Sequence, residues 1–229
     1  MRVSVILIRH GHVEGIDTLR FRGRVHLPLT GAGLCQAEQT RDYVCRIAPH
    51  LAKIYSSPLT RCITTGSIIG QPFGLTPLPR EGLNDIDYGD WQGRTVAEVS
   101  SASPAAVAAW FSSPADAQIP GGETLQGLSD RVSRTLEEIV KESPGEAVAI
   151  IGHDSVNRVI LLLALGLQLS SYWRIGQQAG AVSRLEFESG RWSVESLNET
   201  GQLYPTLRHS SANRASVTDS HGSTVGSRQ

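Results

Sequence analysis

Short apolar runs alternate with segments of helical periodicity along most of the chain. Residues 3–8 form a nearly continuous, largely β-branched run that stops abruptly at polar residues and glycine, the pattern of a strand covered on both faces of a parallel sheet. The same criteria predict six strands, at 3–8, 52–55, 74–79, 147–151, 182–187 and 192–197. Helices are predicted from Thr30-Gly31 to about 48, from a cap at Ser56-Ser57-Pro58 to about Gly70, over 124–142, and after His153-Asp154 to about Leu165.

This alternation predicts an α/β fold, a three-layer sandwich whose mostly parallel central sheet carries helices on both faces. The run at 147–151 has the composition of a central strand. In such sheets, ligands bind beyond the carboxyl ends of the strands. Residues that directly follow a predicted strand are therefore the first candidates for a functional site.

The composition changes near residue 204. We expect a single domain over residues 1–203 and a disordered, Ser/Thr-rich tail over 204–229, because the tail has almost no large apolar side chains to offset the entropy lost on ordering. The tail carries three arginines and one aspartate, so the body before it is mildly acidic. A site that binds anions must concentrate arginine against that background.

The overall charge excludes several classes of partner. The 229 residues include 21 Lys+Arg and 22 Asp+Glu, for a formal net charge of -1, so the chain lacks the positive field typical of proteins that bind nucleic acid or anionic membranes. The longest apolar run, 159–165, is far shorter than the roughly 20 residues needed to span a bilayer. We expect a cytoplasmic protein with no nucleic-acid or membrane partner.

The three cysteines, Cys35, Cys45 and Cys62, form no CxxC pair and have no histidine at metal-ligand spacing. They are expected to be reduced and to pack as small buried apolar side chains, and no metal site or cofactor is predicted.

Arginine and histidine follow three of the predicted strands. Arg9-His10 follows the first strand, Arg61 lies just beyond the second, and His153-Asp154 follows the fourth. Two guanidinium groups with the amide of Gly11 would form a pocket for a dianion, because the planar fork of arginine binds two oxygens at once. An imidazole nitrogen in that pocket is a competent nucleophile toward phosphorus.

The segment Leu7-Ile8-Arg9-His10-Gly11 resembles the signature of the histidine phosphatase superfamily, also called phosphoglycerate mutase-like. Further segments match that family in the right order, at 21–24, 28–33, 56–65, 83–93, 120–124 and 151–153. The resemblance extends from residue 3 to about 198. It implies the phosphoglycerate mutase-like fold and an enzyme that hydrolyses a small phosphorylated metabolite through a phosphohistidine.

Carried over by position, the resemblance implies that His10 is the nucleophile and that Arg9, Arg61 and His153 hold the phosphoryl oxygens. The residues expected to bind substrate are Gly11, Arg22, Gly23, Asp154 and Ser155. The family's proton donor is normally a glutamate, and Asp85 stands at its position here. Asp154 is the alternative donor, because the acid phosphatase branch uses the aspartate of a His-Asp pair, and Asp87 is a third candidate.

Two departures from the family pattern concern the substrate. Val13 and Ile16 replace polar residues common in relatives, which suggests a more apolar pocket. The segment 93–120 lacks the lysine and paired arginines with which phosphoglycerate mutases hold a second anion, which favours a phosphatase over a mutase. Mutase-type phosphoryl transfer and a non-catalytic phosphate-binding or scaffold role remain the alternatives. Trp110 and Phe111 in this segment are expected to pack in the core rather than to stack on a substrate.

Overall fold

A computed structural model describes residues 2–203, so the predicted tail at 204–229 lies outside the described residues. One sheet has the strand order β3-β2-β4-β1-β5-β6. The strands are β1 (Arg2–Arg9), β2 (Leu51–Ser56), β3 (Pro77–Pro79), β4 (Ala147–Gly152), β5 (Val182–Glu188) and β6 (Arg191–Glu199). The α-helices are α1 (Gly31–Ile47), α2 (Thr60–Gly70), α3 (Val96–Ala102), α4 (Pro104–Ser112), α5 (Leu125–Glu142) and α6 (Asp154–Leu165).

The sheet is parallel except at one edge. Strands β1 to β4 run parallel to one another, whereas β5 is antiparallel to β1 and β6 is antiparallel to β5. The predicted central strand is confirmed, since β4 lies between β2 and β1. The third strand is shorter than predicted because Gly74, at φ +66°, reverses the chain and leaves only Pro77–Pro79 to pair at the sheet edge, where proline is tolerated.

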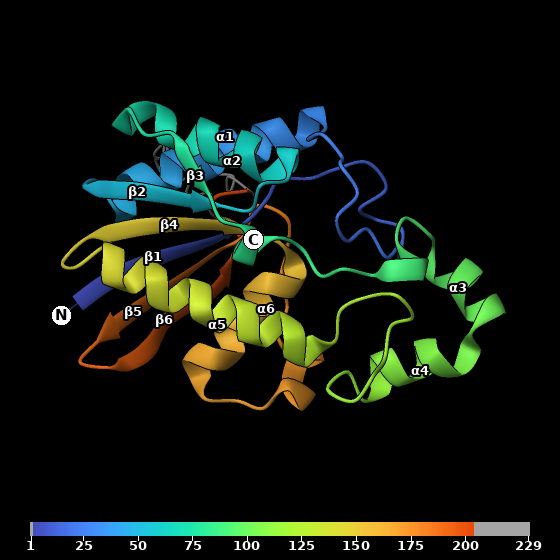
Figure 1. Ribbon diagram of the computed structural model, residues 1–229. Coiled ribbons are helices and arrows are strands. Elements are labelled where there is room, and N and C mark those ends of the chain that lie inside the picture. Colours follow the sequence, from blue (N-terminus) through green and yellow to red (C-terminus); the bar gives the residue numbers. More distant parts are fainter. Residues whose placement is uncertain (1, 204–229) are drawn as a thin grey trace, which may run out of the picture.

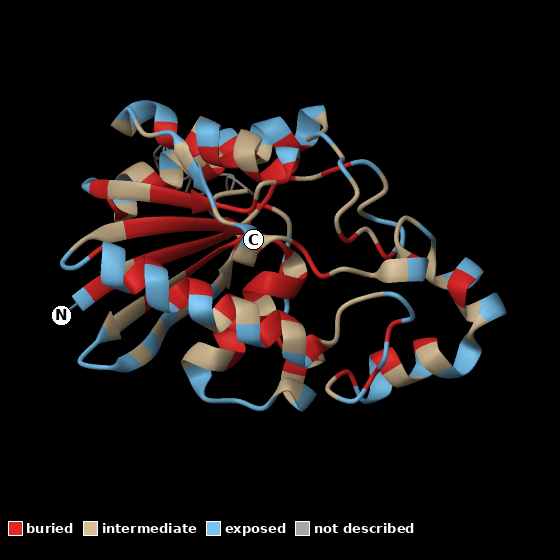
Figure 2. Ribbon diagram, in the orientation of Figure 1, coloured by how far each residue is buried: buried red, intermediate tan, exposed pale blue. Residues whose placement is uncertain are grey.

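Two hydrophobic cores lie on the two faces of the sheet, as the three-layer prediction requires. Alternate residues of β1 divide between them: Ile6 and Ile8 pack toward α1 and α2, whereas Val5 and Leu7 pack toward α5 and α6. Figure 1 shows the helix pairs on opposite sides of the sheet, and Figure 2 shows buried strands beneath helices whose outer faces are exposed. None of the helices within residues 2–203 has the length and apolar character needed to cross a membrane.

Threonine side chains cap two of the predicted helices, whereas the one cap predicted from the sequence is wrong. The Thr30 and Thr124 side chains accept hydrogen bonds from the amides of Gly33 and Gly127, which caps α1 and α5. Helix α2 begins later than predicted, at Thr60, and no side chain caps it. The hydroxyl of Ser57, a predicted cap residue, instead contacts His153.

The carboxyl ends of β1, β2 and β4 lie level with one another, because Arg9 pairs with Gly152 and Ser56 pairs with Ile151. The segment that carries α3 and α4 stands beyond these strand ends (Figure 1). Gly11 lets the loop after β1 pass close to α1, since a Cβ there would lie 2.4 Å from the carbonyl oxygen of Gly33. The fold therefore brings three of the candidate segments to one edge.

Candidate active site

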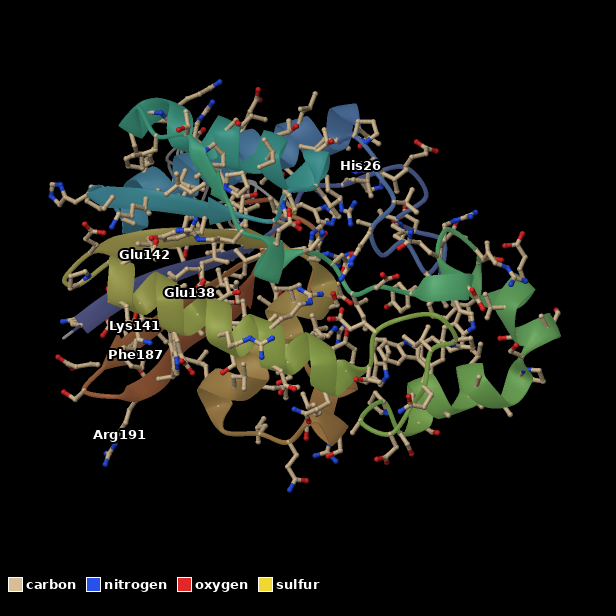
Figure 3. The ribbon with its side chains drawn as sticks, viewed as in Figure 1. His26, Glu138, Lys141, Glu142, Phe187 and Arg191 are labelled. Atoms are coloured by element: carbon tan, nitrogen blue, oxygen red, sulfur yellow. The ribbon has the colours of Figure 1, made fainter. Side chains whose placement is uncertain are left out.

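The three strand ends bring His10, Arg61 and His153 together. The Arg61 Nε lies 3.2 Å from His10 Nε2 and 3.3 Å from His153 Nδ1, and the two imidazole rings are 5.3 Å apart between centroids. Side chains fill the space between the strand ends and the segment with α3 and α4 (Figure 3). The three residues are buried, and they come from segments that lie far apart in the sequence.

The orientation of the His10 ring leaves one nitrogen unprotonated. His10 is 4% exposed, and its Nδ1 lies 2.7 Å from the carbonyl oxygen of Gly11. A carbonyl can only accept a hydrogen bond, so Nδ1 carries the proton and Nε2 keeps its lone pair. The ring thus turns an unprotonated nitrogen toward Arg61.

Burial lowers the pKa of both histidines well below the ordinary value. For His10, the positive charges of a protonated His153, of Arg61 and of Arg9 add to the effect of burial on the pKa. For His153, burial comes first and Arg61 and Arg9 lower its pKa further, although the Asp85 carboxylate lies 3.5 Å from its Nδ1. Both imidazoles are therefore neutral near pH 7.

Arg61 is fixed by its remaining donors. Its terminal nitrogens donate to the carbonyl oxygens of Val25 and Gly23, both at 2.8 Å, and to Oδ2 of Asp85 at 3.1 Å. The guanidinium is almost completely buried. It therefore links the loop after β1, the histidine pair and the carboxylate of Asp85 in one arrangement.

Two further arginines hold buried donors with nothing to bind. Among residues 2–203, the buried side-chain nitrogens without a hydrogen-bond partner are Arg9 Nε and Arg22 Nε. Both arginines line a cavity of about 80 Å³ together with His10 and Arg61. An unpaired buried N–H is costly, so unpaired donors beside a small cavity indicate a site for an anion.

Asp85 is held at this cavity by several donors. Its Oδ1 accepts from the amide of Ile86 at 2.9 Å and from the hydroxyl of Ser155, and its Oδ2 accepts from Arg61. Arg131 of α5 donates to the carbonyl of Asp85 at 3.0 Å and forms an ion pair with Glu123. The carboxylate thus lies within the group that contains both histidines.

The rival carboxylates have other partners. Asp154, at the start of α6, is 3.7 Å from Arg9 and 3.1 Å from Arg158, and it lines the same cavity. Asp87 pairs with Arg24 at 3.4 Å and accepts the amide of Gly89. Asp87 therefore organises the loop, and it does not line the cavity.

Some sequence expectations differ from the observed geometry. The amide of Gly11, expected to face the anion, donates to Oγ1 of Thr65 at 3.3 Å, and the Gly11 carbonyl orients His10. Gly23 does line the cavity. Val13 and Ile16 were expected to make the pocket more apolar. Val13 is completely buried and does not line the cavity, so it does not affect the pocket, whereas Ile16 lines an adjoining cavity.

Sequence reasoning missed the supporting residues Ser57, Cys62, Arg131 and Glu123. Ser57 Oγ lies 2.7 Å from His153 Nε2, and the Cys62 thiol lies 3.5 Å from the same nitrogen. Burial raises the pKa of Cys62 to about 12, so the thiol stays protonated. The family segment at 120–124 could have pointed to one of these residues, because Glu123 lies within it and forms the ion pair with Arg131.

Other histidines lie apart from this site. His12 contacts Oγ1 of Thr30 at 2.9 Å, and His26 is exposed on an outer loop (Figure 3). Over the described part of the chain, no group of three or more histidine, cysteine, aspartate or glutamate side chains is placed to hold a metal ion.

A buried, unprotonated imidazole nitrogen among arginines has the chemistry needed for phosphoryl transfer through histidine. The chain belongs to the histidine phosphatase superfamily (branch 1), whose family model matches residues 5–200. It is a phosphoric monoester hydrolase of that family.

Curated relatives agree with this assignment, and a solved structure shares the fold. Phosphoserine phosphatase 1 of Hydrogenobacter thermophilus is 31% identical over 201 residues, which cover 88% of this chain and 94% of the relative. A metal-independent phosphoserine phosphatase of Arabidopsis thaliana is 29% identical over 202 residues, or 87% of this chain and 83% of the relative. The fold matches that of Bacillus stearothermophilus YhfR with a TM-score of 0.83 at 24% identity, covering 88% of this chain and 99% of the other.

Proposed function

We propose that the enzyme hydrolyses small phosphomonoesters with Nε2 of His10 as the nucleophile. The observation that carries this proposal is the unprotonated Nε2 of a buried, oriented imidazole at a cavity lined by Arg9 and Arg22, whose Nε donors have no partner. A phosphoryl group in the cavity would supply the acceptors that these donors lack. The same position places its phosphorus next to the nucleophile.

In the first step, the Nε2 lone pair forms a bond to phosphorus while the bond from phosphorus to the ester oxygen breaks. Asp85 acts as the general acid in this step: it must carry a proton, which it gives to the departing oxygen, and the alcohol leaves. The Gly11 carbonyl, which accepts from Nδ1, stabilises the charge that the ring gains.

In the second step, water attacks the phosphohistidine. Asp85 takes a proton from that water, the bond from nitrogen to phosphorus breaks, and the electron pair returns to Nε2. Inorganic phosphate leaves, and both His10 and Asp85 regain their starting protonation.

The positively charged side chains at the cavity would stabilise the negative charge on the phosphoryl oxygens. Arg9, Arg22 and Arg61 would bind the phosphoryl oxygens, and His153 would donate from Nδ1 once an oxygen replaces its contact with Arg61. Helices α2 and α6 begin at this edge, so their N-terminal ends add positive potential.

The experiment that tests this function is turnover of phosphomonoesters with product analysis. Phosphoserine is the first candidate because two relatives are phosphoserine phosphatases. Hydrolysis in ¹⁸O-labelled water should place one ¹⁸O in the inorganic phosphate, and 3-phosphoglycerate should not be converted to 2-phosphoglycerate. Isomerisation without release of phosphate would establish the mutase alternative. The absence of turnover with every ester tested would favour a non-catalytic, phosphate-binding role.

Ser57→Ala is expected to lower kcat by about 10-fold, the effect of losing one buried hydrogen bond. The Ser57 hydroxyl can accept from His153 Nε2 in the free enzyme or donate to it when Nδ1 turns its proton to the phosphoryl group, because a hydroxyl does both. Ser57→Thr keeps a hydroxyl and should restore most of the rate.

The ¹⁵N chemical shifts of the His153 ring report whether the tautomer changes in Ser57→Ala, which a loss of packing alone would not cause. Cys62→Ala is the matched control, because it removes the weaker neighbour of the same nitrogen. An equal loss in the Ala and Thr variants of Ser57 would contradict this positioning role.

Acid should destabilise the protein through the buried histidines. Their pKa values are lowered in the folded state, so below about pH 6.5 the unfolded chain binds protons that the folded chain does not. Stability is therefore lost as the pH falls, with a slope of about 1 kcal/mol per pH unit for each histidine. Urea unfolding between pH 7.5 and 5 measures the slope, and His10→Gln should reduce it by about one proton. An unchanged slope in that variant would show that His10 titrates normally.

A further inference from the structure

A second cavity, of about 260 Å³, opens beside the phosphate cavity. The two share Arg9, Arg20, Arg22, Tyr88 and Asp154 as lining residues, so they are neighbours across one boundary. A phosphomonoester whose phosphorus lies at His10 must extend its alcohol portion away from the nucleophile. The second cavity lies next to the phosphate cavity and can therefore accommodate the alcohol portion.

One wall of the second cavity is aromatic and fixed. The ring of Phe111, in α4, lies 5.3 Å from that of Trp173 with an interplanar angle of 32°. The Trp173 Nε1 donates to the carbonyl of Trp110 at 2.9 Å, and Trp110 is itself buried against Tyr88. Phe111 nevertheless remains 42% exposed, so the prediction that it packs in the core holds for Trp110 and is wrong for Phe111.

The other wall carries a leucine that the fold leaves uncovered. Leu19 is 74% exposed, the most exposed large apolar side chain in the described residues. Its backbone carbonyl accepts the amide of Val96 at 2.9 Å, and a β-bridge pairs Arg20 with Thr95, so the loop that presents it is tied to the start of α3. An exposed leucine and an exposed phenylalanine therefore line a single cavity from segments 92 residues apart.

The charges at this cavity disfavour an amino group. The carboxylate of Asp154, the acidic side chain that lines this cavity, already binds Arg9 and Arg158. In the phosphate cavity, the Asp85 carboxylate accepts hydrogen bonds from Arg61, Ser155 and the Ile86 amide. A substrate ammonium group would find no free carboxylate among the residues that line these two cavities, and it would lie near several guanidinium groups.

We infer that the second cavity binds the leaving group and selects phosphate esters of apolar alcohols, aromatic ones above all. This inference rests on the proposed function, since it requires the phosphoryl group at His10. Contact with Leu19 and Phe111 removes apolar surface from water, which favours such an alcohol over a small or zwitterionic one. Phosphoserine is accordingly expected to be a poorer substrate than an ester of an aromatic alcohol, because its ammonium group finds no free carboxylate, although the arginines of this cavity attract its carboxylate.

The test compares benzyl phosphate with ethyl phosphate and O-phosphoserine, all of which release an alkyl alcohol and so depend on the same acid. The kcat/KM for benzyl phosphate should exceed that for each of the other two by about 10-fold or more, which corresponds to about 1.4 kcal/mol. Leu19→Ala and Phe111→Ala should each reduce this ratio several-fold, chiefly through KM for benzyl phosphate. Leu165→Ala is the matched control, because Leu165 is 44% exposed and lies outside this cavity, and it should leave all three esters unaffected.

Two results would overturn the inference. One is a kcat/KM for O-phosphoserine equal to or above that for benzyl phosphate, and the other is an unchanged ratio in both cavity variants. In either case, turnover that depends on His10 would still support the proposed function. No turnover of any ester by the folded wild-type enzyme would instead reject the proposed function itself.

Discussion

His10→Ala is expected to remove turnover and covalent labelling together, with a loss in kcat on the order of 10⁴ or more. Nε2 of His10 is the atom that would form the bond to phosphorus, and the ring is oriented for this by the Gly11 carbonyl. His153 cannot replace it, because its Nε2 faces Ser57 and its ring is completely buried. The loss should therefore be seen with every ester, whatever its leaving group.

Rapid acid-free quenching with ³²P-labelled substrate measures the intermediate, which should be labile in acid and stable in base in the wild-type protein and absent from His10→Ala. His12→Ala is the control, since His12 is the next histidine along the chain and contacts Thr30 outside the cavity. Thermal unfolding of each variant shows that the fold persists. Labelling of the His10→Ala protein at the wild-type level would reject the phosphohistidine intermediate.

The placement of the main side chains could be predicted because it follows from local sequence and the rules of parallel sheets. Arg9-His10 and His153 each follow a run that is apolar enough to be a buried strand, and parallel strands present their carboxyl ends at one edge. The predicted strands and the three layers are confirmed for the same reason. Each depended on a pattern within about 20 residues of chain.

The supporting contacts could not be predicted because they join segments that the sequence does not relate. Arg131 lies on the strongly amphipathic helix α5, where periodicity identifies the buried face but does not show that one arginine reaches the carbonyls of Gly82, Asn84 and Asp85. Ser57 was predicted to cap α2, and the position of β4 redirects its hydroxyl to His153. Leu19 and Phe111 meet at one cavity only because a loop and α4 fold over the same edge.

Asp85 and Asp154 are both close enough to the cavity to serve as the proton donor, and the geometry favours Asp85. Asp85 shares Arg61 with both histidines, whereas Asp154 is bound between Arg9 and Arg158 and lies partly exposed. The shorter side chain of aspartate, compared with the glutamate common at this position, is accommodated because Ser155 and the Ile86 amide hold its carboxylate against Arg61.

Asp85→Asn is expected to reduce kcat on an alkyl ester on the order of 10² or more and to slow p-nitrophenyl phosphate much less. An acid matters in proportion to how badly the leaving group needs a proton, and p-nitrophenolate leaves readily without one. Asp154→Asn should slow both esters by similar factors, because it loosens Arg9 at the phosphoryl site and does not remove the acid. The measurement is the ratio of kcat for benzyl phosphate to kcat for p-nitrophenyl phosphate in each variant, with Asp87→Asn as a carboxylate control that pairs with Arg24 outside the cavity. A ratio that falls in Asp154→Asn and stays unchanged in Asp85→Asn would assign the donor to the His153-Asp154 pair, and the role of Asp85 would then be to hold Arg61.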